Sequence, residues 1–344
     1  MSAPPIALRS QAAAVDTQPI QDIAHFVELR SEWFDLWSGI PDSTVFQSPD
    51  WLIPWWAQYG DGAMLSFAFR CDGRLVGLAP LYIYEDTEHR TRNVLLIGTG
   101  NSDYLDIVVH PEFKSVCWTS VLRELERRSN VWDECDFQQL RSCSSLVQAA
   151  GEMGRLKTQL QQDEPCPVLD VHSPLSFPIQ KKAKYYRRRL ENSGTFQIEE
   201  ATPDSFGEIF DALEHLHGQR WRARGVSGVL SAECDREFHR CAARAFLNSK
   251  MLRLYGARLN GKIIAALYAF CSRRRTYFYL SGFDPEYAHF SIGTVILAHA
   301  IEAARRHGCE LFDFLRGQEA YKYRWGAADQ PTFRRRFLKR ATAG

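Results

Sequence analysis

The chain has 344 residues, of which 45% are hydrophobic and 24% are charged. A chain of this length can bury a full core and, at about 100 to 200 residues per domain, predicts two domains. Lysine plus arginine (42) nearly cancel aspartate plus glutamate (41), which leaves a net charge of +1. This balance argues against a protein that binds DNA or an anionic membrane through its overall charge, so any attraction for anions must be local.

The ends and the cysteines predict a cytoplasmic protein. The start, MSAPPIALRSQAAAVDTQPI, has no basic end followed by a continuous apolar segment, and no stretch reaches the roughly 18 apolar residues of a membrane span. We therefore expect residues 1–19 to be a disordered tail and expect no transmembrane segment. The nine cysteines include no CxxC pair and no Cys/His cluster at metal-ligand spacing, which indicates reduced thiols and no metal site.

The first half, residues 20–165, has the pattern of an α/β domain with a hairpin near its start. Asp72-Gly73 lies between two apolar runs and predicts the hairpin turn. In chain order the pattern predicts a helix over 20–37, a Trp-rich helix over 50–56, strands over 65–70, 75–83, 93–98 and 105–109, a helix over 114–129 and a strand over 136–140.

The second half, residues 166–344, follows a polar, proline-punctuated stretch at 161–178 that suits a strand-bearing linker. Asn260-Gly261 is a strong hairpin signal between two strands. The predicted elements are a basic helix from 181, a strand over 195–199, helices over 204–224 and 234–249, strands over 252–259, 263–270 and 276–283, a helix over 291–307, a strand over 310–315 and a last strand over 331–339.

One stretch near the C-terminus, FDFLRGQEAYKYRWG at 312–326, is unusual for a core strand. The apolar run ends in Arg316-Gly317 and changes at once into alternating aromatic and basic side chains. This pattern indicates that a ligand is held there, although core and rim residues with long cationic stems would give a similar alternation.

The order of elements in the second half, together with these residues, resembles a GCN5-related N-acetyltransferase (GNAT). Within that superfamily the chain is most similar to the bacterial tandem-GNAT acyltransferases of cellulose and exopolysaccharide biosynthesis (CelD/BcsL-type), and distantly to the Fem-type peptidyltransferases. The matching residues are Ser291-Ile292-Gly293-Thr294, Asp313-Phe314 with Gly317, Tyr321-Lys322, the basic run 181–189, the segment 217–225 and the loop 102–106. The resemblance implies an α/β fold of two GNAT-like domains in tandem, each a mixed, mainly antiparallel sheet flanked by helices.

The resemblance also implies a thioester donor, acetyl-CoA or another acyl-CoA. The residues expected to bind it are Phe283, Ser291, Gly293, Thr294, Phe314, Arg316, Gly317 and Lys322. A helix that begins near Ser291 would offer unpaired N–H groups to a phosphate, although Ser291 could equally be a simple cap. The usual Gln/Arg-x-x-Gly-x-Gly/Ala pattern is degenerate here, with Ala288, Ser291 and Gly293 in its key positions, so an acyl carrier protein or an aminoacyl-tRNA stays open as the donor.

The resemblance implies a catalytic role for Tyr321, which would protonate the leaving thiolate. For the base, histidine or a carboxylate would serve, and we favour His217 and Glu319 over Glu214, Asp284 and Asp313. His217 lies in a helix rich in arginine and could instead be an ordinary polar-face residue.

The acceptor is expected to be a small molecule or a saccharide, held between the halves by Asp103, Tyr104, Asp106, Arg220 and Trp221. Turn chemistry would also explain the residues of the 101–106 loop. The basic run 181–189 could bind tRNA or an acidic carrier protein, or it could be a solvated helix face.

The sequence therefore predicts a bacterial, cytoplasmic N- or O-acyltransferase that moves an acyl group by direct attack, with a degenerate N-terminal copy shaping the acceptor site. A Fem-like aminoacyl-tRNA-dependent ligase and a non-catalytic binding module of a polysaccharide or natural-product assembly system remain alternatives. The oligomeric state is left open.

Overall fold

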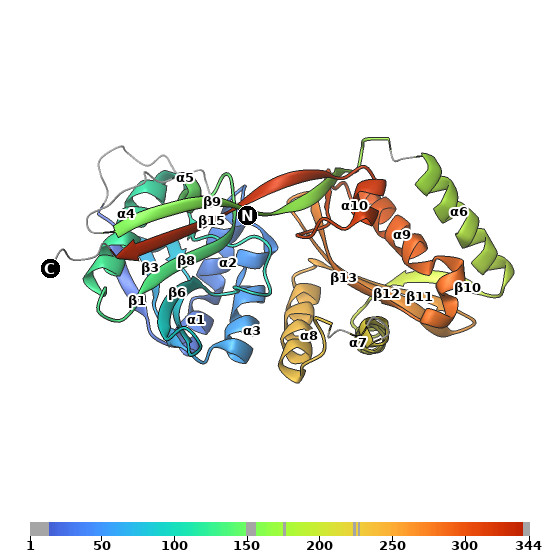
Figure 1. The fold of residues 1–344 in the computed structure, drawn as a ribbon, viewed down its shortest axis with the longest axis horizontal. Coiled ribbons are helices and arrows are strands. Elements are labelled where there is room, and N and C mark those ends of the chain that lie inside the picture. The colour runs from blue at the N-terminus through green and yellow to red at the C-terminus, as the bar shows by residue number, and fades with distance from the viewer. Residues whose placement is uncertain (1–13, 149–155, 175–176, 223–224, 226–227, 340–344) are drawn as a thin grey trace.

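The chain folds into two α/β units that lie side by side, an N-terminal unit on the left of Figure 1 and a C-terminal unit on the right. This computed structural model describes residues 14–148, 156–174, 177–222, 225 and 228–339. Each unit has mixed, mainly antiparallel strands flanked by helices, so the predicted fold class is confirmed. Residues 1–13 of the predicted disordered tail lie outside the described residues.

The helices of the N-terminal unit follow the predicted order. Ser48 precedes the Trp-rich helix and Pro49 occupies its first turn, where the missing N–H of proline is not needed. The helices are α1 (Ile23–Glu28), α2 (Arg30–Gly39), α3 (Pro49–Tyr59), α4 (Lys114–Arg127) and α5 (Ser145–Gln148), with short 3-10 helices η1 (Val45–Gln47) and η2 (Pro111–Phe113).

A four-stranded sheet in this unit corrects two expectations. Its order is β1 (Asp16–Ile20), β3 (Ser66–Cys71), β4 (Arg74–Ala79) and β7 (Val108–Val109). Strand β1 takes residues that were expected in the disordered tail and at the start of a helix. Its sequence, DTQPI, contains a proline, which weakens a strand signal but is tolerated on the edge strand that β1 forms.

A second sheet, of eleven strands, runs through both units in the order β10-β11-β12-β13-β14-β9-β15-β8-β6-β5-β2. The predicted strand over 75–83 is split at Pro80, so that β4 and β5 belong to different sheets. The strands of the N-terminal unit in this sheet are β2 (Ala63–Met64), β5 (Leu81–Asp86), β6 (Thr91–Leu96) and β8 (Glu134–Arg141).

The C-terminal unit contains the predicted antiparallel meander. Asn260 and Gly261 both have positive φ, 50° and 84°, as the tight turn between two of its strands requires. The strands are β10 (Phe196–Glu200), β11 (Leu252–Leu259), β12 (Lys262–Ser272), β13 (Arg275–Phe283) and β14 (Leu311–Asp313); the helices are α6 (Phe177–Asn192), α7 (Phe206–Arg222), α8 (Glu233–Asn248), α9 (Ile292–Arg306) and α10 (Ala320–Arg324), with the 3-10 helix η3 (Pro285–Phe290).

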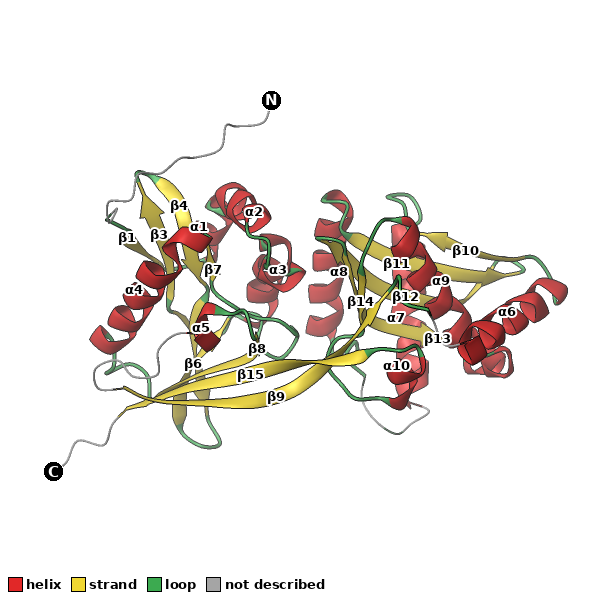
Figure 2. Ribbon diagram, turned by 90° about the horizontal axis from the view of Figure 1, so that it is seen from above, coloured by secondary structure: helices red, strands yellow, loops and turns green. Residues whose placement is uncertain are grey.

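The two units repeat one motif and exchange their last strands. In the first unit β6 and β8 are parallel and joined through α4, and in the second β13 and β14 are parallel and joined through α9. Strand β9 (Leu156–Asp170) leaves the first unit and pairs with β14, whereas β15 (Ala328–Lys339) returns and pairs with β8. Figure 2 shows β9 and β15 running together along one side of both units. The predicted boundary at 165/166 falls inside β9, so a single strand passes through it.

The units also share one hydrophobic cluster. Trp51 of α3 packs edge-on against Phe238 of α8, with ring centroids 4.8 Å apart, and Tyr59 donates a hydrogen bond of 2.6 Å to Asp235. Residues of β12 and β13 belong to the same buried cluster. The N-terminal unit therefore supports the sheet that carries the candidate site. Among the described helices, none combines the length and the hydrophobicity that a membrane crossing needs.

Candidate active site

The site begins where β13 and β14 separate. These parallel strands pair over only three residues, from Arg275 opposite Leu311 to Tyr277 opposite Asp313. β14 then ends, whereas β13 continues to Phe283. Beyond Tyr277 this edge of β13 has no paired strand among the described residues, so it is a place where an extended ligand could add like a strand.

A bulge in β13 sets one wall of a pocket. Tyr268 of β12 lies opposite Leu280 and Ala269 lies opposite Phe278, which leaves Tyr279 as an extra residue. Phe278, Ser281 and Phe283 line a cavity of about 350 Å³, which we call the β13 pocket. The predicted donor residue Phe283 is therefore at a pocket wall.

The start of α9 forms the next wall. Ser291 has left-handed backbone angles (φ 46°, ψ 42°) and its side chain makes no capping hydrogen bond, which does not support the simple cap interpretation. Ser291, Gly293 and Thr294 all line the β13 pocket, and a Cβ on Gly293 would lie 3.5 Å from the ring of Phe283. The first N–H groups of a helix have no intrahelical partner, so this wall suits a phosphate.

Two cations complete the pocket and were not predicted. Lys182 comes from α6 and Arg324 from α10, and both line the β13 pocket with Tyr321 and Trp325. Arg324 lies three residues after Tyr321, the spacing that puts two side chains on one helix face, and Lys182 belongs to the basic run 181–189. The helical spacing and the basic run are the sequence signals that could have identified Arg324 and Lys182.

Tyr321 is held at the pocket by an aromatic contact. Its ring packs edge-on against Phe314, with centroids 6.3 Å apart and an interplanar angle of 80°. Phe314 itself is buried, and its N–H donates to the carbonyl of Pro167. The expectation that Phe314 contacts the donor is therefore corrected, because its ring lies in the core and positions Tyr321.

Lys322 has a structural role in place of the predicted phosphate contact. The side chain is only 3% exposed, and Nζ donates to the carbonyls of Leu315, Arg316 and Gly317 at 3.1, 2.7 and 2.9 Å. It also forms an ion pair of 2.9 Å with Glu319. All of its donors are used within the turn that joins β14 to α10, so Lys322 fixes this turn.

We expect Lys322→Met to destabilise the protein by about 3 kcal/mol, because buried carbonyls would lose their charged partner. Urea unfolding of the variant would measure the loss. The matched control is Lys157→Met, an exposed lysine of β9, which should change the free energy of unfolding by less than about 0.5 kcal/mol. Equal stability of the two variants would contradict the structural role of Lys322.

Glu319 and Gly317 also belong to the turn and not to the pocket lining. Glu319 is exposed and precedes α10, where its carboxylate pairs with Lys322. Gly317 has φ +103°, and a Cβ there would lie 2.6 Å from the Glu319 carboxylate. Gly317 is therefore required by the turn, and Glu319 as the base stays a prediction that the pocket geometry does not favour.

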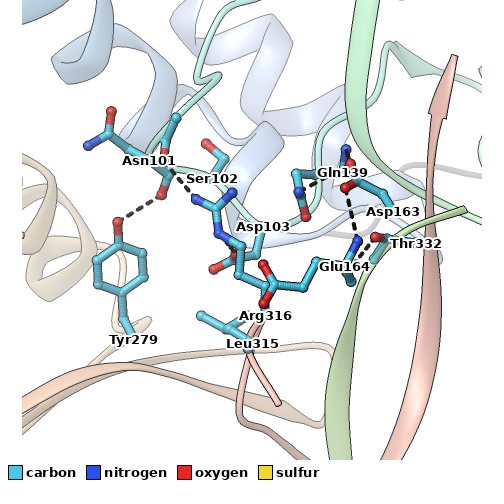
Figure 3. Close-up of polar contacts among 12 residues, drawn as sticks. Asn101, Ser102, Asp103, Gln139, Asp163, Glu164, Tyr279, Leu315, Arg316 and Thr332 are labelled. Atoms are coloured by element: carbon cyan, nitrogen blue, oxygen red, sulfur yellow. Dashed lines mark hydrogen bonds and ion pairs between the residues drawn. The ribbon is translucent and has the colours of Figure 1, made fainter. Parts of the chain in front are cut away.

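Arg316 links the turn to the N-terminal unit (Figure 3). Its Nε lies 2.8 Å from a carboxylate oxygen of Asp103, and it donates to the carbonyl of Gly100 at 2.7 Å. From β13, the Tyr279 hydroxyl donates to the carbonyl of Asn101 at 2.8 Å. Arg316 thus makes a contact between the units, which brings Asp103 to the back of the turn, and its donor contact stays a prediction.

The other two residues expected to bind the acceptor from this loop, Tyr104 and Asp106, lie away from the β13 pocket. Tyr104 is 1% exposed and its hydroxyl donates to Asp313 at 2.8 Å, so its hydrogen-bonding group is already used. Asp106 is half-buried and borders a separate cavity of about 30 Å³. Neither residue lines the β13 pocket, and acceptor contacts by Asp103 and Asp106 remain predictions.

The pKa of Asp103 is raised to about 6, mainly by burial and also by the nearby Asp313 carboxylate, against the opposite effect of Arg316 and Lys322. The folded protein therefore holds a proton on Asp103 that the unfolded chain loses near pH 4. Ionisation of this carboxyl costs stability as the pH rises from about 4 to about 6, and the cost is fully present above that range.

We expect Asp103→Asn to gain stability relative to the native protein as the pH rises from 4 to 7, by up to about 3 kcal/mol. Unfolding midpoints measured across this range would show the difference. Asp204→Asn, at an exposed carboxylate, should show no such trend. A relative loss of stability at pH 7 would mean that the ion pair with Arg316 outweighs the cost of burial.

His217 and Trp221 line a different cavity, of about 470 Å³, which we call the α7 pocket. His217 is 2% exposed, and its Nε2 accepts a hydrogen bond of 2.7 Å from the indole N–H of Trp221. A Cβ on Gly282 would lie 2.3 Å from the backbone nitrogen of His217, whereas the neighbouring Ser281 and Phe283 line the β13 pocket. The two pockets therefore lie on opposite faces of β13. The side chain of Arg220 is outside the described residues.

A family model matches most of the C-terminal unit. Residues 179–323 match the model of the "Acetyltransferase (GNAT) domain". This part of the chain is similar to GNAT acetyltransferase domains. The match begins in α6 and ends in α10, so it contains β13, α9 and the residues that line the β13 pocket, except Arg324 and Trp325. The CelD/BcsL-type group is not resolved by it.

Solved structures show the same fold over both units. FemX is similar with a TM-score of 0.63 at 11% identity, over 89% of this chain and 95% of that one. A C-terminal domain (DUF2156) assigned to a lysylphosphatidylglycerol synthetase from Agrobacterium fabrum gives 0.57 at 14%, over 90% and 92%. L-PGS from Bacillus licheniformis gives 0.53 at 10%, over 85% and 88%. No curated protein sequence matches the chain.

Proposed function

We propose that the protein is an acyltransferase that moves an acetyl or other acyl group from acyl-CoA to an amine or hydroxyl of a small-molecule or saccharide acceptor. The observation that carries this proposal is the β13 pocket. The edge of β13 beyond Tyr277, the first turn of α9 and two cations surround one cavity, and most of its lining lies in the part of the chain that matches the GNAT model.

The pocket offers a separate contact to each part of such a donor. The N–H groups at the start of α9, with Lys182 and Arg324, would hold the pyrophosphate. The pantetheine arm carries amides that could pair with the edge of β13 beyond its pairing with β14, which would lead the thioester toward Tyr321. These contacts would supply proximity, which is the main contribution of an enzyme to a direct transfer.

The proposed chemistry is a direct attack. The acceptor nitrogen or oxygen forms a bond to the thioester carbonyl carbon, and the C–S bond breaks with its electron pair moving to sulfur. The Tyr321 hydroxyl donates its proton to this thiolate, and the proton lost by the acceptor goes to a base or to water. A backbone N–H of β13 would stabilise the charge that develops on the carbonyl oxygen.

The α7 pocket supports an acceptor that approaches from the other face of β13. It contains the indole of Trp221, the carboxylates of Asp211 and Glu214 and the buried His217. An aromatic face next to carboxylates suits a sugar ring or an amine. His217 as the base requires its Nε2 to leave the hydrogen bond from Trp221, so it remains a proposal. The resemblance to exopolysaccharide acyltransferases makes saccharides the first acceptors to test.

A Fem-like aminoacyl-tRNA-dependent ligase is the second candidate. The favouring observations are the cationic helix α6 beside the β13 pocket and the fold shared with FemX. Charged tRNA should then bind with a strong dependence on salt, because phosphate contacts release counterions.

The test is transfer from acetyl-CoA to a panel of amino sugars, sugars and amines, with released CoA separated chromatographically. A thiol reagent is unsuitable because Cys234 and Cys241 are exposed. Acceptor-dependent CoA release that Gly293→Trp abolishes is the expected result. Release unaffected by this variant would contradict the proposal.

A further inference from the structure

The helix α6 carries a local charge that the rest of the chain does not explain. Six of the nine residues from Lys181 to Arg189 are basic, in a chain whose net charge is +1. The acid within α6 is Glu191, which pairs with Arg187 at 3.0 Å. A solvated helix is usually stabilised by alternating charges, so this excess indicates an anionic partner.

The side chains of α6 point in three directions. Ile179 and Lys182 reach the β13 pocket. Gln180, Ala183, Lys184 and Arg187, which are spaced as one helix face, line a different cavity. Lys181, Tyr185 and Arg188 form the outward face, where Tyr185 is 56% exposed. The helix thus connects the pocket to an exposed surface with a large aromatic group at its centre.

The different cavity, of about 370 Å³, lies between α6 and α9, and we call it the α6–α9 groove. Its rim carries Lys184, Arg187 and Arg305 against one carboxylate, Glu302. Its floor is apolar and is built by Ala183, Val295, Ile301 and Trp325. Trp325 also lines the β13 pocket, so the groove and the pocket are neighbours.

The half-buried His299 also lines the groove. Burial is the main cause that lowers the pKa of this imidazole to about 4, and Arg306 and Arg187 lower it further toward that value, against a weaker opposite effect of Glu302.

We propose that the outward face of α6 and the α6–α9 groove are the docking surface of an acidic acyl carrier protein, which presents its acyl-phosphopantetheine arm to the β13 pocket. This inference rests on the proposed function, since it supplies the same thioester on the same arm from a protein in place of CoA. Cations around an apolar floor match an acidic amphipathic helix, whose apolar side chains would enter the groove. A tRNA backbone offers phosphates to the rim but nothing apolar to the floor or to Tyr185.

The test compares two double variants with the full chain. Lys181→Glu with Arg188→Glu reverses the outward face of α6, and Arg123→Glu with Lys157→Glu makes the same change at exposed positions of α4 and β9. The probe is a bacterial acyl carrier protein loaded with acetyl-phosphopantetheine and labelled for fluorescence anisotropy. Unfolding midpoints check that all proteins are folded.

We expect the α6 variant to bind the carrier at least tenfold more weakly at 50 mM salt, and the control to stay within twofold of the native protein. Stabilisation by acetyl-CoA should be unchanged in both, because neither variant touches the β13 pocket. Equal carrier binding by the two variants would overturn the inference, as would binding of uncharged tRNA that competes with the carrier at α6. Carrier binding through α6 without any response to acetyl-CoA would support the docking surface while contradicting acyl-CoA as donor.

Discussion

Replacing Gly293 by tryptophan is expected to abolish stabilisation by acetyl-CoA. The Cα of Gly293 faces the β13 pocket, and the ring of Phe283 lies 3.5 Å from where a Cβ would stand, so an indole would fill the space between them. A ligand at a hundred times its dissociation constant stabilises the native state by about 2.7 kcal/mol. A thermal-shift titration with acetyl-CoA and free CoA should show this shift in the native protein and none in the variant.

Gly293→Ala is the matched control. Its methyl group would make an ordinary contact with Phe283, and Gly293 has no positive φ that an alanine could not adopt. The shift should therefore persist with at most a modest loss of affinity. A full shift in Gly293→Trp would place the donor elsewhere, and loss of the shift in Gly293→Ala would indicate a contact closer than the structure has.

The second large effect is expected from Tyr321→Phe. Phenylalanine keeps the edge-on contact with Phe314 but removes the hydroxyl that would protonate the thiolate. General acid catalysis contributes about 10²- to 10⁴-fold, so kcat should fall by at least about a hundredfold while KM for the donor stays within a few fold. The fall in kcat should be smaller with an acetyl thioester of a more acidic thiol, because the thiolate of such a thiol leaves readily without protonation.

Tyr323→Phe is the matched control, which tests whether the loss of activity is specific to the hydroxyl of Tyr321. Tyr323 lies on the same short helix, but its hydroxyl donates to Asp329 at 2.7 Å and it does not line the β13 pocket. This control should keep kcat within about twofold. A Tyr321→Phe variant as active as this control would remove Tyr321 from the mechanism and would favour water as the proton source.

The sequence predicted the elements that local pattern determines. The meander β11–β13 consists of largely apolar runs that are mostly buried, with a turn at Asn260-Gly261, and α9 has a long apolar stripe that ends before Gly308. In contrast, β9 was expected only as part of a strand-bearing linker over 161–178, because that stretch is polar and punctuated by prolines. Its stability comes from pairing with β15, a strand some 170 residues later, which no local pattern contains.

The same dependence on distant contacts explains which residues of the candidate site the sequence could predict. Ser291, Gly293, Thr294 and Tyr321 follow from a helix start and a family motif, and the structure places all four on one pocket. The sequence could not predict the contacts of Lys322 and Arg316, because their partners are backbone carbonyls of a turn and an aspartate from the other unit.

Hydrogen exchange with and without CoA would test the central claim most directly. Donor binding in the β13 pocket predicts slower exchange at the amides of residues 280–283 and 292–294, with the 101–106 loop and the α7 pocket unchanged. Slower exchange confined to the α7 pocket or the 101–106 loop, with β13 and α9 unaffected, would contradict the assignment of the β13 pocket as the donor site.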